Sequence, residues 1–332
     1  MRVIVIGTSA GGVSALKTLL GGLPADLDAI PLAVLHMAPS SPGLLPELLT
    51  NTGRLRCVHP SQGEKLLRGR FYLAPPDHHM LIERRGRIRL SHGPKENRSR
   101  PAIDPLFRSA ALAFGPDVIG VILTGNLDDG TAGLLAVKAS GGTTVIQDPT
   151  DASAPSMPRS AGQHVHIDHK VSLSELAPLL VRLTNKPPRA EPRIMPDRLR
   201  IEAEIATGEK TTLGSIAEIG HPSLFTCPDC HGTLLRVNDE LLRFRCHTGH
   251  AFTAQSLLAT LDENTEDTIW SAVRALQEGA MLLQHLAQHA RDAGQQHEAS
   301  NLDRQAEDKL KQADLVRQAV ASRPEHDAFS AT

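Results

Sequence analysis

Residues 3–12 of the chain read Val-Ile-Val-Ile-Gly-Thr-Ser-Ala-Gly-Gly, and this stretch decides the fold of the amino-terminal half. The four apolar residues predict a buried strand, the glycine-rich run predicts a tight turn, and residues 13–20 predict a helix. This order places Ser9 at the carboxyl end of a strand. There it lies beside the free backbone N–H groups of a helix start, which can stabilise an anion.

Strand-like and helix-like segments alternate to about residue 185. Strands are expected at 2–6, 29–35, 70–73, 118–123 and 143–146, and further helical stretches at 43–49 and 133–138. Residues 80–91, with Gly86 near the middle, predict an appended antiparallel hairpin. We therefore predict an α/β domain with a doubly wound, mostly parallel sheet over residues 1–185.

The carboxyl-terminal half is expected to hold smaller parts. Four prolines between residues 185 and 196 predict a linker over 186–196. A small zinc-ribbon-like unit is expected over 197–260, an α-helical hairpin over 261–322, and a tail over 323–332. The first hairpin helix is predicted from Thr265, because Glu266 and Asp267 suit a first turn and apolar residues follow at 4-3 spacing.

Bulk composition argues against several classes of function. The 332 residues carry a net charge of −2 without long runs of one sign, which disfavours a role on nucleic acid or on a membrane surface. Aromatic residues make up only 3%, too few for platforms that stack bases or sugars. The sequence begins with a strand and shows neither a signal peptide nor a membrane span, so we expect a cytoplasmic protein without membrane insertion.

Two later strands also end in residues with catalytic chemistry, His36 and the acidic pair at 128–129. Parallel strands bring their carboxyl ends to one edge of the sheet, so Ser9, His36 and Asp129 are expected to meet there. His36 would remove the Ser9 proton, and Asp129 would fix the imidazole tautomer. Backbone donors for the resulting oxyanion are expected beside the serine and before the acidic pair, at Ala10 and Asn126.

Each residue of this trio also has a simpler interpretation. Ser9 fits a phosphate-cradling or plain turn, His36 a core histidine, and the acidic pair a turn or helix cap. A dinucleotide site is the main rival, but the usual Gly-x-Gly-x-x-Gly is absent and Asp28 precedes its strand instead of ending it. Ser9 does lie in a Gly-x-Ser-x-Gly motif, yet after the first strand and in the order Ser…His…Asp, unlike α/β-hydrolases. We prefer the same chemistry on another scaffold.

Seven blocks of sequence carry a more specific signal. They are Ile6-Gly-Thr-Ser-Ala-Gly-Gly12, Leu35-His-Met-Ala-Pro39, Tyr72-Leu-Ala-Pro-Pro-Asp-His-His79, Asn97-Arg-Ser-Arg-Pro-Ala-Ile-Asp-Pro-Leu-Phe107, Leu123-Thr-Gly-Asn-Leu-Asp-Asp-Gly130, Gln147-Asp-Pro149 and Met157-Pro-Arg159. In this order, across roughly residues 1–180, they resemble the protein-glutamate methylesterase family of bacterial chemotaxis (CheB type).

The resemblance implies hydrolysis of glutamyl methyl esters in the signalling helices of chemoreceptors, with release of methanol and without a catalytic cofactor. Deamidation of receptor glutamines would follow the same route, and other chemosensory proteins are possible partners. Ser9 matches the nucleophile, His36 the base and Asp129 the orienting acid, whereas Asp128 is expected to be solvated or to cap a helix. A non-catalytic signalling scaffold that keeps this fold and binds partners through its helical hairpin is the alternative.

Three further points follow from the resemblance. Gly125-Asn126-Leu127 replaces the usual Gly-Met-Gly, which puts the Asn126 donor in question. The usual receiver domain is not expected before a strand that starts at residue 2, so activity would be constitutive or set by a partner or the carboxyl-terminal half. Arg98 and Arg100 are expected to meet the acidic receptor surface, with an ion pair to Asp104 as the structural alternative.

The cysteines predict a metal site. Cys227-Pro-Asp-Cys230, Cys246 and His250 form a Cys₃His set suited to tetrahedral zinc, and a hairpin of residues 233–237 and 241–245 around Asn238-Asp-Glu240 would bring them together. Four protein ligands leave no open position, so the zinc would be structural. His231 and His247 are alternative ligands, a metal-free reduced hairpin is the alternative state, and Cys57 is expected to be a small buried hydrophobe.

Overall fold

The computed structural model describes residues 1–185, 197–208, 218–237 and 240–321. The chain divides into two compact units, Met1–Leu257 and Leu258–Thr332. The predicted linker over 186–196 and the predicted tail over 323–332 lie outside the described residues, as do Asn238 and Asp239 of the predicted metal-site hairpin.

The larger unit is built on a seven-stranded sheet in which every pairing is parallel. Its strands are β1 (Val3–Thr8), β2 (Ile30–Leu35), β3 (Arg56–Val58), β4 (Arg70–Leu73), β7 (Val118–Ile122), β8 (Thr143–Gln147) and β9 (His169–Val171). They lie in the order β3-β4-β2-β1-β7-β8-β9, so that β1 is central. The five predicted strands are all present. The short β3 and β9 were not predicted, because three residues carry no periodic pattern.

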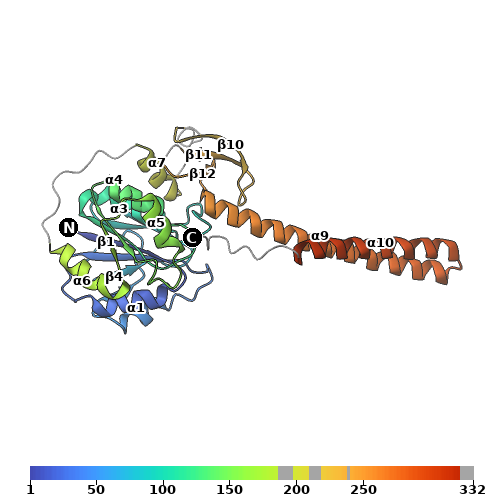
Figure 1. Ribbon diagram of the computed structural model, residues 1–332, viewed down its shortest axis with the longest axis horizontal. Coiled ribbons are helices and arrows are strands. Elements are labelled where there is room, and N and C mark those ends of the chain that lie inside the picture. Colours follow the sequence, from blue (N-terminus) through green and yellow to red (C-terminus); the bar gives the residue numbers. More distant parts are fainter. Residues whose placement is uncertain (186–196, 209–217, 238–239, 322–332) are drawn as a thin grey trace. The chain divides into compact units, whose positions relative to one another are not determined.

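Helices cover both faces of this sheet, because alternate residues of β1 point to opposite sides. Ile4 and Ile6 join the core under α1 (Gly12–Gly22), α2 (Leu45–Thr50) and α6 (Leu173–Thr184). Val3 and Val5 join the core under α3 (Ile103–Phe114), α4 (Thr131–Ala139) and α5 (Ser156–His164), and the short turn η1 (Gly115–Asp117) follows α3. Figure 1 shows α1 and α6 on one side of β1 and α3 and α4 on the other. The α/β prediction is confirmed.

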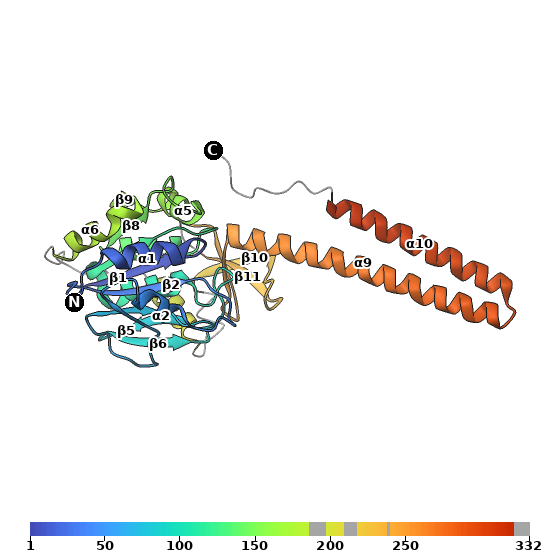
Figure 2. The ribbon, with the colours of Figure 1, turned by 90° about the horizontal axis from the view of Figure 1, so that it is seen from below.

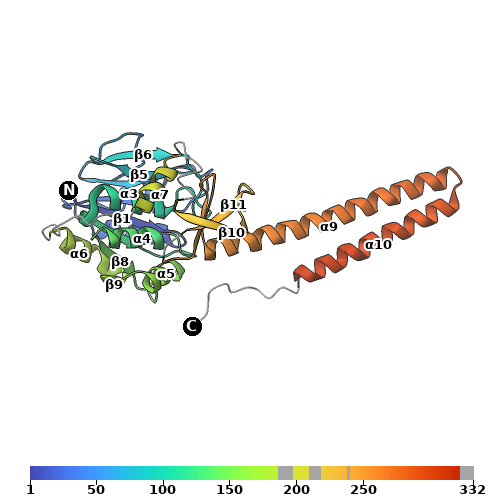
Figure 3. The same ribbon diagram turned by 90° about the horizontal axis from the view of Figure 1, so that it is seen from above.

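The predicted hairpin is also present. β5 (His79–Glu83) and β6 (Arg87–Ser91) pair antiparallel, and the turn between them places Arg85 and Gly86 in the left-handed region, at φ 68° and 69°. Met80, Ile82 and Ile88 belong to the same core as α3, so the hairpin packs on that helix. Figure 3 shows the hairpin beside α3.

A second, antiparallel sheet completes the larger unit. It consists of β10 (Gly220–Thr226), β11 (Thr233–Val237), β12 (Arg243–Cys246) and β13 (Ala251–Thr253), and α7 (Asp197–Ala206) precedes it in the chain. Phe244 and Phe252 form its small core with two of the cysteines. This sheet and the parallel sheet belong to the same compact unit, Met1–Leu257.

Two helices, α9 (Ala254–Asp292) and α10 (Gln296–Ala321), run side by side (Figures 2 and 3). Small residues seven apart are buried along the hairpin, at Val273, Ala280 and Ala287 on α9 and at Ala299, Ala306 and Ala313 on α10. The prediction that the first helix begins at Thr265 is wrong: it begins at Ala254, where the Thr253 hydroxyl accepts the Ser256 N–H at 3.0 Å as an N-cap. Among the described helices, none is both long and apolar enough to cross a lipid bilayer.

Candidate active site

Ser9 lies one residue beyond β1, in a turn tied to the end of β7. Its backbone N–H donates to the carbonyl of Thr124 at 3.0 Å, and the Thr124 hydroxyl donates to the carbonyl of Ala10 at 2.9 Å. Gly11 has φ 76°, and a Cβ on Gly12 would lie within 2.7 Å of a neighbouring threonine side chain. The two glycines therefore permit the sharp turn into α1 that leaves Ser9 half-buried at the carboxyl end of the sheet.

His36 is the neighbour of Ser9 across the sheet. β1 and β2 are paired to their last residues, Thr8 and Leu35, and the His36 N–H donates to the Thr8 carbonyl at 3.2 Å. Ser9 and His36 are the next residues on the two strands. The Ser9 hydroxyl makes no hydrogen bond to the described residues, as is frequent for catalytic pairs before substrate binds.

Asp129 lies at the start of α4 and accepts hydrogen bonds on both carboxylate oxygens. His36 Nε2 lies 2.7 Å from Oδ2, which also accepts the Ile103 N–H at 2.7 Å. Oδ1 accepts the Asn97 amide and the Gly130 N–H, each at 2.9 Å. Burial raises the pKa of Asp129, but the hydrogen bonds, led by that from His36, more than offset it and hold this pKa below its usual value. A charged Asp129 can only accept at Oδ2, so this contact favours the His36 tautomer with its proton on Nε2 and with Nδ1 as a hydrogen-bond acceptor.

The neighbouring Asp128 was predicted to be solvated or to cap a helix, and this prediction is wrong. Its side chain is buried, and its Oδ1 accepts the Thr253 hydroxyl at 2.7 Å. Burial raises its pKa to about 6. The residue that covers it lies 125 positions away in the sequence, so no local pattern around Asp128 could show the burial.

The two predicted backbone oxyanion donors lie at exposed positions near Ser9. Ala10 follows Ser9 directly, and Asn126 follows Gly125, at which a Cβ would lie only 3.0 Å from the Ser9 Cβ. Neither the Ala10 nor the Asn126 N–H donates to another group within the described part of the chain. Both are therefore available to a ligand at Ser9.

Of the two loop arginines, Arg100 is bound internally. Its guanidinium lies 2.7 Å from Asp77 and donates to the carbonyls of His92 and Gly93. An ion pair between Arg100 and Asp104 is therefore wrong: Asp104 instead accepts the Asn97 amide and the Gly133 N–H. Arg98 is half-buried in the same loop.

Comparison with known proteins decides the family. The profile described as CheB methylesterase matches residues 4–180, about half of the chain, and this range contains Ser9, His36 and Asp129. The chain belongs to the CheB methylesterase family. The prediction made from the seven blocks is confirmed, whereas the four metal-ligand candidates lie beyond the match.

The matched region makes up a different share of each relative's length. A putative protein-glutamate methylesterase/protein-glutamine glutaminase of Leptospira interrogans is 39% identical over 180 residues, which is 54% of this chain and 93% of that protein. A protein-glutamate methylesterase/protein-glutamine glutaminase of Geobacter metallireducens is 37% identical over 178 residues, which is 53% of this chain and 49% of that protein. The CheB methylesterase catalytic domain of Thermotoga maritima is similar in structure, with 31% identity and a TM-score of 0.53 over 55% of this chain and 98% of that one.

Outside the CheB-like region, Cys227, Cys230, Cys246 and His250 form a group that could hold a metal ion. Their ligand atoms all lie within 4.8 Å of one another. The Sγ atoms of Cys230 and Cys246 are 3.6 Å apart, and His250 Nδ1 lies 3.5 Å from Cys246 Sγ and 3.7 Å from Cys227 Sγ. A tetrahedral zinc with bonds of about 2.3 Å to sulfur has sulfur–sulfur edges of about 3.8 Å, so the donors fit this ion. His231 and His247 are not part of the group, and Cys57 is buried elsewhere in the core.

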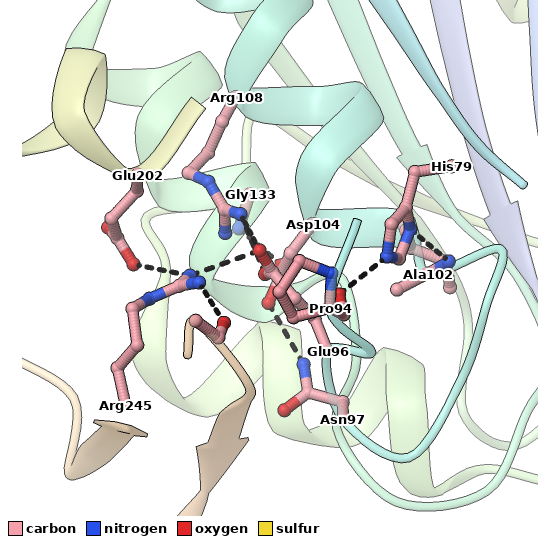
Figure 4. Close-up of polar contacts among 12 residues, drawn as sticks. His79, Pro94, Glu96, Asn97, Ala102, Asp104, Arg108, Gly133, Glu202 and Arg245 are labelled. Atoms are coloured by element: carbon pink, nitrogen blue, oxygen red, sulfur yellow. Dashed lines mark hydrogen bonds and ion pairs between the residues drawn. The ribbon is translucent and has the colours of Figure 1, made fainter. Parts of the chain in front are cut away.

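A buried ion network joins the second sheet to the α/β part, and sequence reasoning missed it (Figure 4). Glu96 accepts hydrogen bonds from Arg108 at 2.6 Å and from Arg245 at 3.0 Å. Arg245 also donates to Glu202 at 3.1 Å, and Arg243 contacts both oxygens of Glu202 at 2.8 and 3.0 Å. All five side chains are buried. The network therefore fixes β12 against α3 and α7.

Replacing Glu202 by glutamine is expected to lower the free energy of unfolding by about 3–5 kcal/mol, because it removes the buried negative charge that Arg243 and Arg245 share. Glu204→Gln, on the exposed side of the same helix, is the matched control and should change it by less than about 0.5 kcal/mol. Chemical denaturation followed by circular dichroism measures both. Equal stability of the two variants would contradict the importance of the network.

The same carboxylate predicts a pH dependence. Burial raises the pKa of Glu202, but Arg243, Arg108 and Arg245 outweigh burial and hold it well below its usual value. A depressed folded-state pKa stabilises the protein above the unfolded pKa of about 4.3, and this stabilisation is lost as the pH falls further. The difference between wild type and Glu202→Gln should therefore shrink in acid.

Proposed function

We propose that this chain is a serine hydrolase that removes methyl esters from glutamyl side chains of chemoreceptor-type proteins and releases methanol. The observation that carries the proposal is the His36–Asp129 hydrogen bond of 2.7 Å beside the Ser9 turn, within the region that matches the CheB methylesterase family. The relatives are named methylesterases and glutaminases. No observation favours a non-catalytic scaffold.

The proposed mechanism uses one serine, one histidine and one aspartate. His36 Nδ1 takes the Ser9 proton as Oγ attacks the ester carbonyl, and Asp129 stabilises the imidazolium through Nε2–H. The tetrahedral oxyanion accepts hydrogen bonds from the backbone N–H groups of Ala10 and Asn126. His36 then gives the proton to the leaving methoxide. Methanol departs, and the glutamyl group remains bound to Ser9 as an ester. Water, deprotonated by His36, hydrolyses that ester and regenerates Ser9.

Deamidation needs only another leaving group. A receptor glutamine would form the same acyl-enzyme on Ser9, with ammonia leaving instead of methanol, and water would again release glutamate. No cofactor enters either cycle. Arg98 and Arg100 are the proposed contacts to the acidic receptor surface, with Arg100 also holding the loop through Asp77.

The proposal is tested by incubating the full chain with a methylated receptor signalling fragment and measuring methanol by gas chromatography. The same fragment without methyl groups is the control substrate, and a fragment with glutamines in place of the methyl glutamates tests for ammonia. We expect methanol from the methylated fragment alone. Folded protein that releases no methanol from fragments of several receptors would contradict the methylesterase.

For the Cys₃His group we propose a structural zinc ion, held by Cys227, Cys230, Cys246 and His250. The spacing of the donors fits a tetrahedral ion, and four protein ligands leave no open coordination position for catalysis. The metal would fix the loop between Cys246 and His250, whose backbone is already closed by the Cys246 N–H donating to the His250 carbonyl at 3.0 Å.

Purified chain is expected to contain about one zinc ion, and His250→Ala is expected to lose it, because three cysteines alone leave the site one ligand short. His247→Ala is the matched control: this exposed histidine lies in the same loop but outside the donor group, so its zinc content should stay at the wild-type level. Metal analysis of both variants by mass spectrometry decides. A zinc-free wild type, or loss of zinc in His247→Ala only, would contradict the assignment.

A further inference from the structure

Asn97 bridges the candidate catalytic acid and a second buried carboxylate. Its amide nitrogen donates one hydrogen bond to Asp129 Oδ1 at 2.9 Å and another to Asp104 Oδ2 at 3.0 Å. Asn97 is itself buried and lies in the left-handed region at φ 47°, which asparagine tolerates better than most residues. Figure 4 shows the amide directed at Asp104. Asn97 is therefore the side-chain donor to Oδ1, the Asp129 oxygen that does not face His36.

Asn97 is held in turn by β13 of the second sheet. Its backbone N–H donates to the Ala251 carbonyl at 2.8 Å, and its side-chain oxygen accepts the Thr253 N–H at 3.0 Å. The Ala251 N–H donates to the carbonyl of Lys95 at 3.2 Å, so β13 runs along residues 95–97 like an added strand. The Thr253 hydroxyl reaches Asp128, directly beside Asp129. Two of the residues that flank the acid are thus bound by β13.

The position of β13 depends on the Cys₃His unit. β13 begins at Ala251, directly after the ligand candidate His250, and pairs with β12, which ends at the ligand candidate Cys246. Arg245 of β12 donates to the Gly249 carbonyl at 2.7 Å and to Glu96, the residue before Asn97, at 3.0 Å. The loop of the proposed metal site therefore contacts the segment that carries Asn97 through both its backbone and a buried charge.

We propose that Asn97 is a positioning residue for Asp129 and that the Cys₃His unit, through β13, holds Asn97 in place, so that catalysis at Ser9 depends on the carboxyl-terminal part of the chain. This inference rests on the proposed function for its effect on rate. Asn97 touches no reacting atom: it acts through Asp129 on the orientation of His36. The Cys₃His unit contributes no group to the reaction, but it is required for full activity.

The physical reason is the number of donors that face Asp129. The Asp129 carboxylate accepts hydrogen bonds from His36, from Asn97 and from three backbone N–H groups. The other ionisable groups around it are Asp104, Asp128 and His79. When Asn97 is removed, Oδ1 loses a donor and the carboxylate can rotate, which misaligns Nε2–H and hence Nδ1. A displacement of about 1 Å in catalytic groups can cost about 100-fold in rate.

The first test compares Asn97→Ala with wild type in the full chain. We expect kcat for methanol release to fall about 100-fold with KM nearly unchanged, and the downfield NMR signal of the His36 Nε2 proton to shift. Asn51→Ala, at the exposed end of α2, is the control and should leave both unchanged. Folded Asn97→Ala with wild-type kcat and an unmoved proton signal would overturn the proposal.

The second test addresses the dependence on the carboxyl-terminal unit and does not remove Asn97. Thr253→Val deletes the hydroxyl that binds Asp128, and we expect kcat to fall about tenfold and Thr253→Ser, which keeps the hydroxyl, to restore it. His250→Ala should lower kcat and shift the His36 signal, whereas His247→Ala should do neither. Zinc-free, folded His250→Ala with full activity would refute the role of the unit.

The NMR signal is recorded without substrate, so it separates the two proposals. If wild type released no methanol, the proposed function would fail, but a His36 proton that shifts in Asn97→Ala and in His250→Ala would still establish the positioning. If wild type is active and neither variant moves the signal or kcat, the positioning fails and the function stands.

Discussion

Replacing Ser9 by alanine is expected to lower kcat for methanol release by about 10⁶-fold, the cost seen when a serine hydrolase loses its nucleophile. The loss is this large because the acyl-enzyme can no longer form: the other hydroxyl at the end of β1, that of Thr8, is buried and donates to the Thr124 carbonyl at 2.8 Å. Substrate binding does not require the hydroxyl, so the affinity for the methylated receptor fragment should stay near that of wild type.

Ser153→Ala is the matched control. Ser153 is exposed and lies against the same turn, since a Cβ added at Gly11 would lie 3.0 Å from the Ser153 Cβ, but no hydrolytic role is proposed for it. A serine-directed fluorophosphonate should label wild type and Ser153→Ala on Ser9, and should leave Ser9→Ala unlabelled. Equal methanol release by wild type and Ser9→Ala would mean that another residue is the nucleophile.

The parts of the molecule that the sequence predicted well are those with local causes. The apolar run before Ser9 predicted a buried strand and the glycines after it predicted a tight turn, so β1 and the position of Ser9 followed from ten residues. The hairpin around Gly86 followed in the same way. The Cys₃His group could be predicted from Cys227 and Cys230, because the spacing of metal ligands is itself a local pattern.

The parts that sequence reasoning missed depend on contacts between distant segments. Asn97 stood out in the sequence only as part of a block that resembles the family. Its hydrogen-bond partners could not be predicted, because Asp129 lies 32 residues away and Thr253 lies 156 residues away. The ion pair between Glu96 and Arg245 spans 149 residues. A buried charge leaves no periodic pattern, so only the fold shows that these residues surround the candidate acid.

The packing of the second sheet against the α/β part also explains why the prediction for Asp128 was wrong. In a lone α/β domain an acidic pair before a helix faces water, and one member caps the helix. In this chain β13 covers that position, and Thr253 replaces water as the donor to Asp128. Residues around the candidate site within 4–180 therefore form hydrogen bonds with a residue outside that range, Thr253.

Asp129→Asn is expected to lower kcat about 10⁴-fold while the fold is retained. The asparagine keeps the shape of the side chain but presents an amide group to a site where every neighbour is a donor. The Ile103 and Gly130 N–H groups and the Asn97 amide all point at the two oxygens, so one of these donors or His36 must lose its acceptor. The imidazole then prefers the tautomer protonated on Nδ1, which cannot take the Ser9 proton.

Asp128→Asn separates this effect from the general loss of a buried acid. Asp128 is adjacent and buried, but it contacts Thr253 and not His36, and an amide oxygen can still accept the Thr253 hydroxyl. Its kcat should fall no more than about tenfold, a change of about 1.4 kcal/mol in the barrier, against about 5.5 kcal/mol for Asp129→Asn. Steady-state methanol release at fixed pH gives both numbers. If both variants lost activity equally, the direct bond from Asp129 to His36 would not be what distinguishes the two acids, and the tautomer argument would fail.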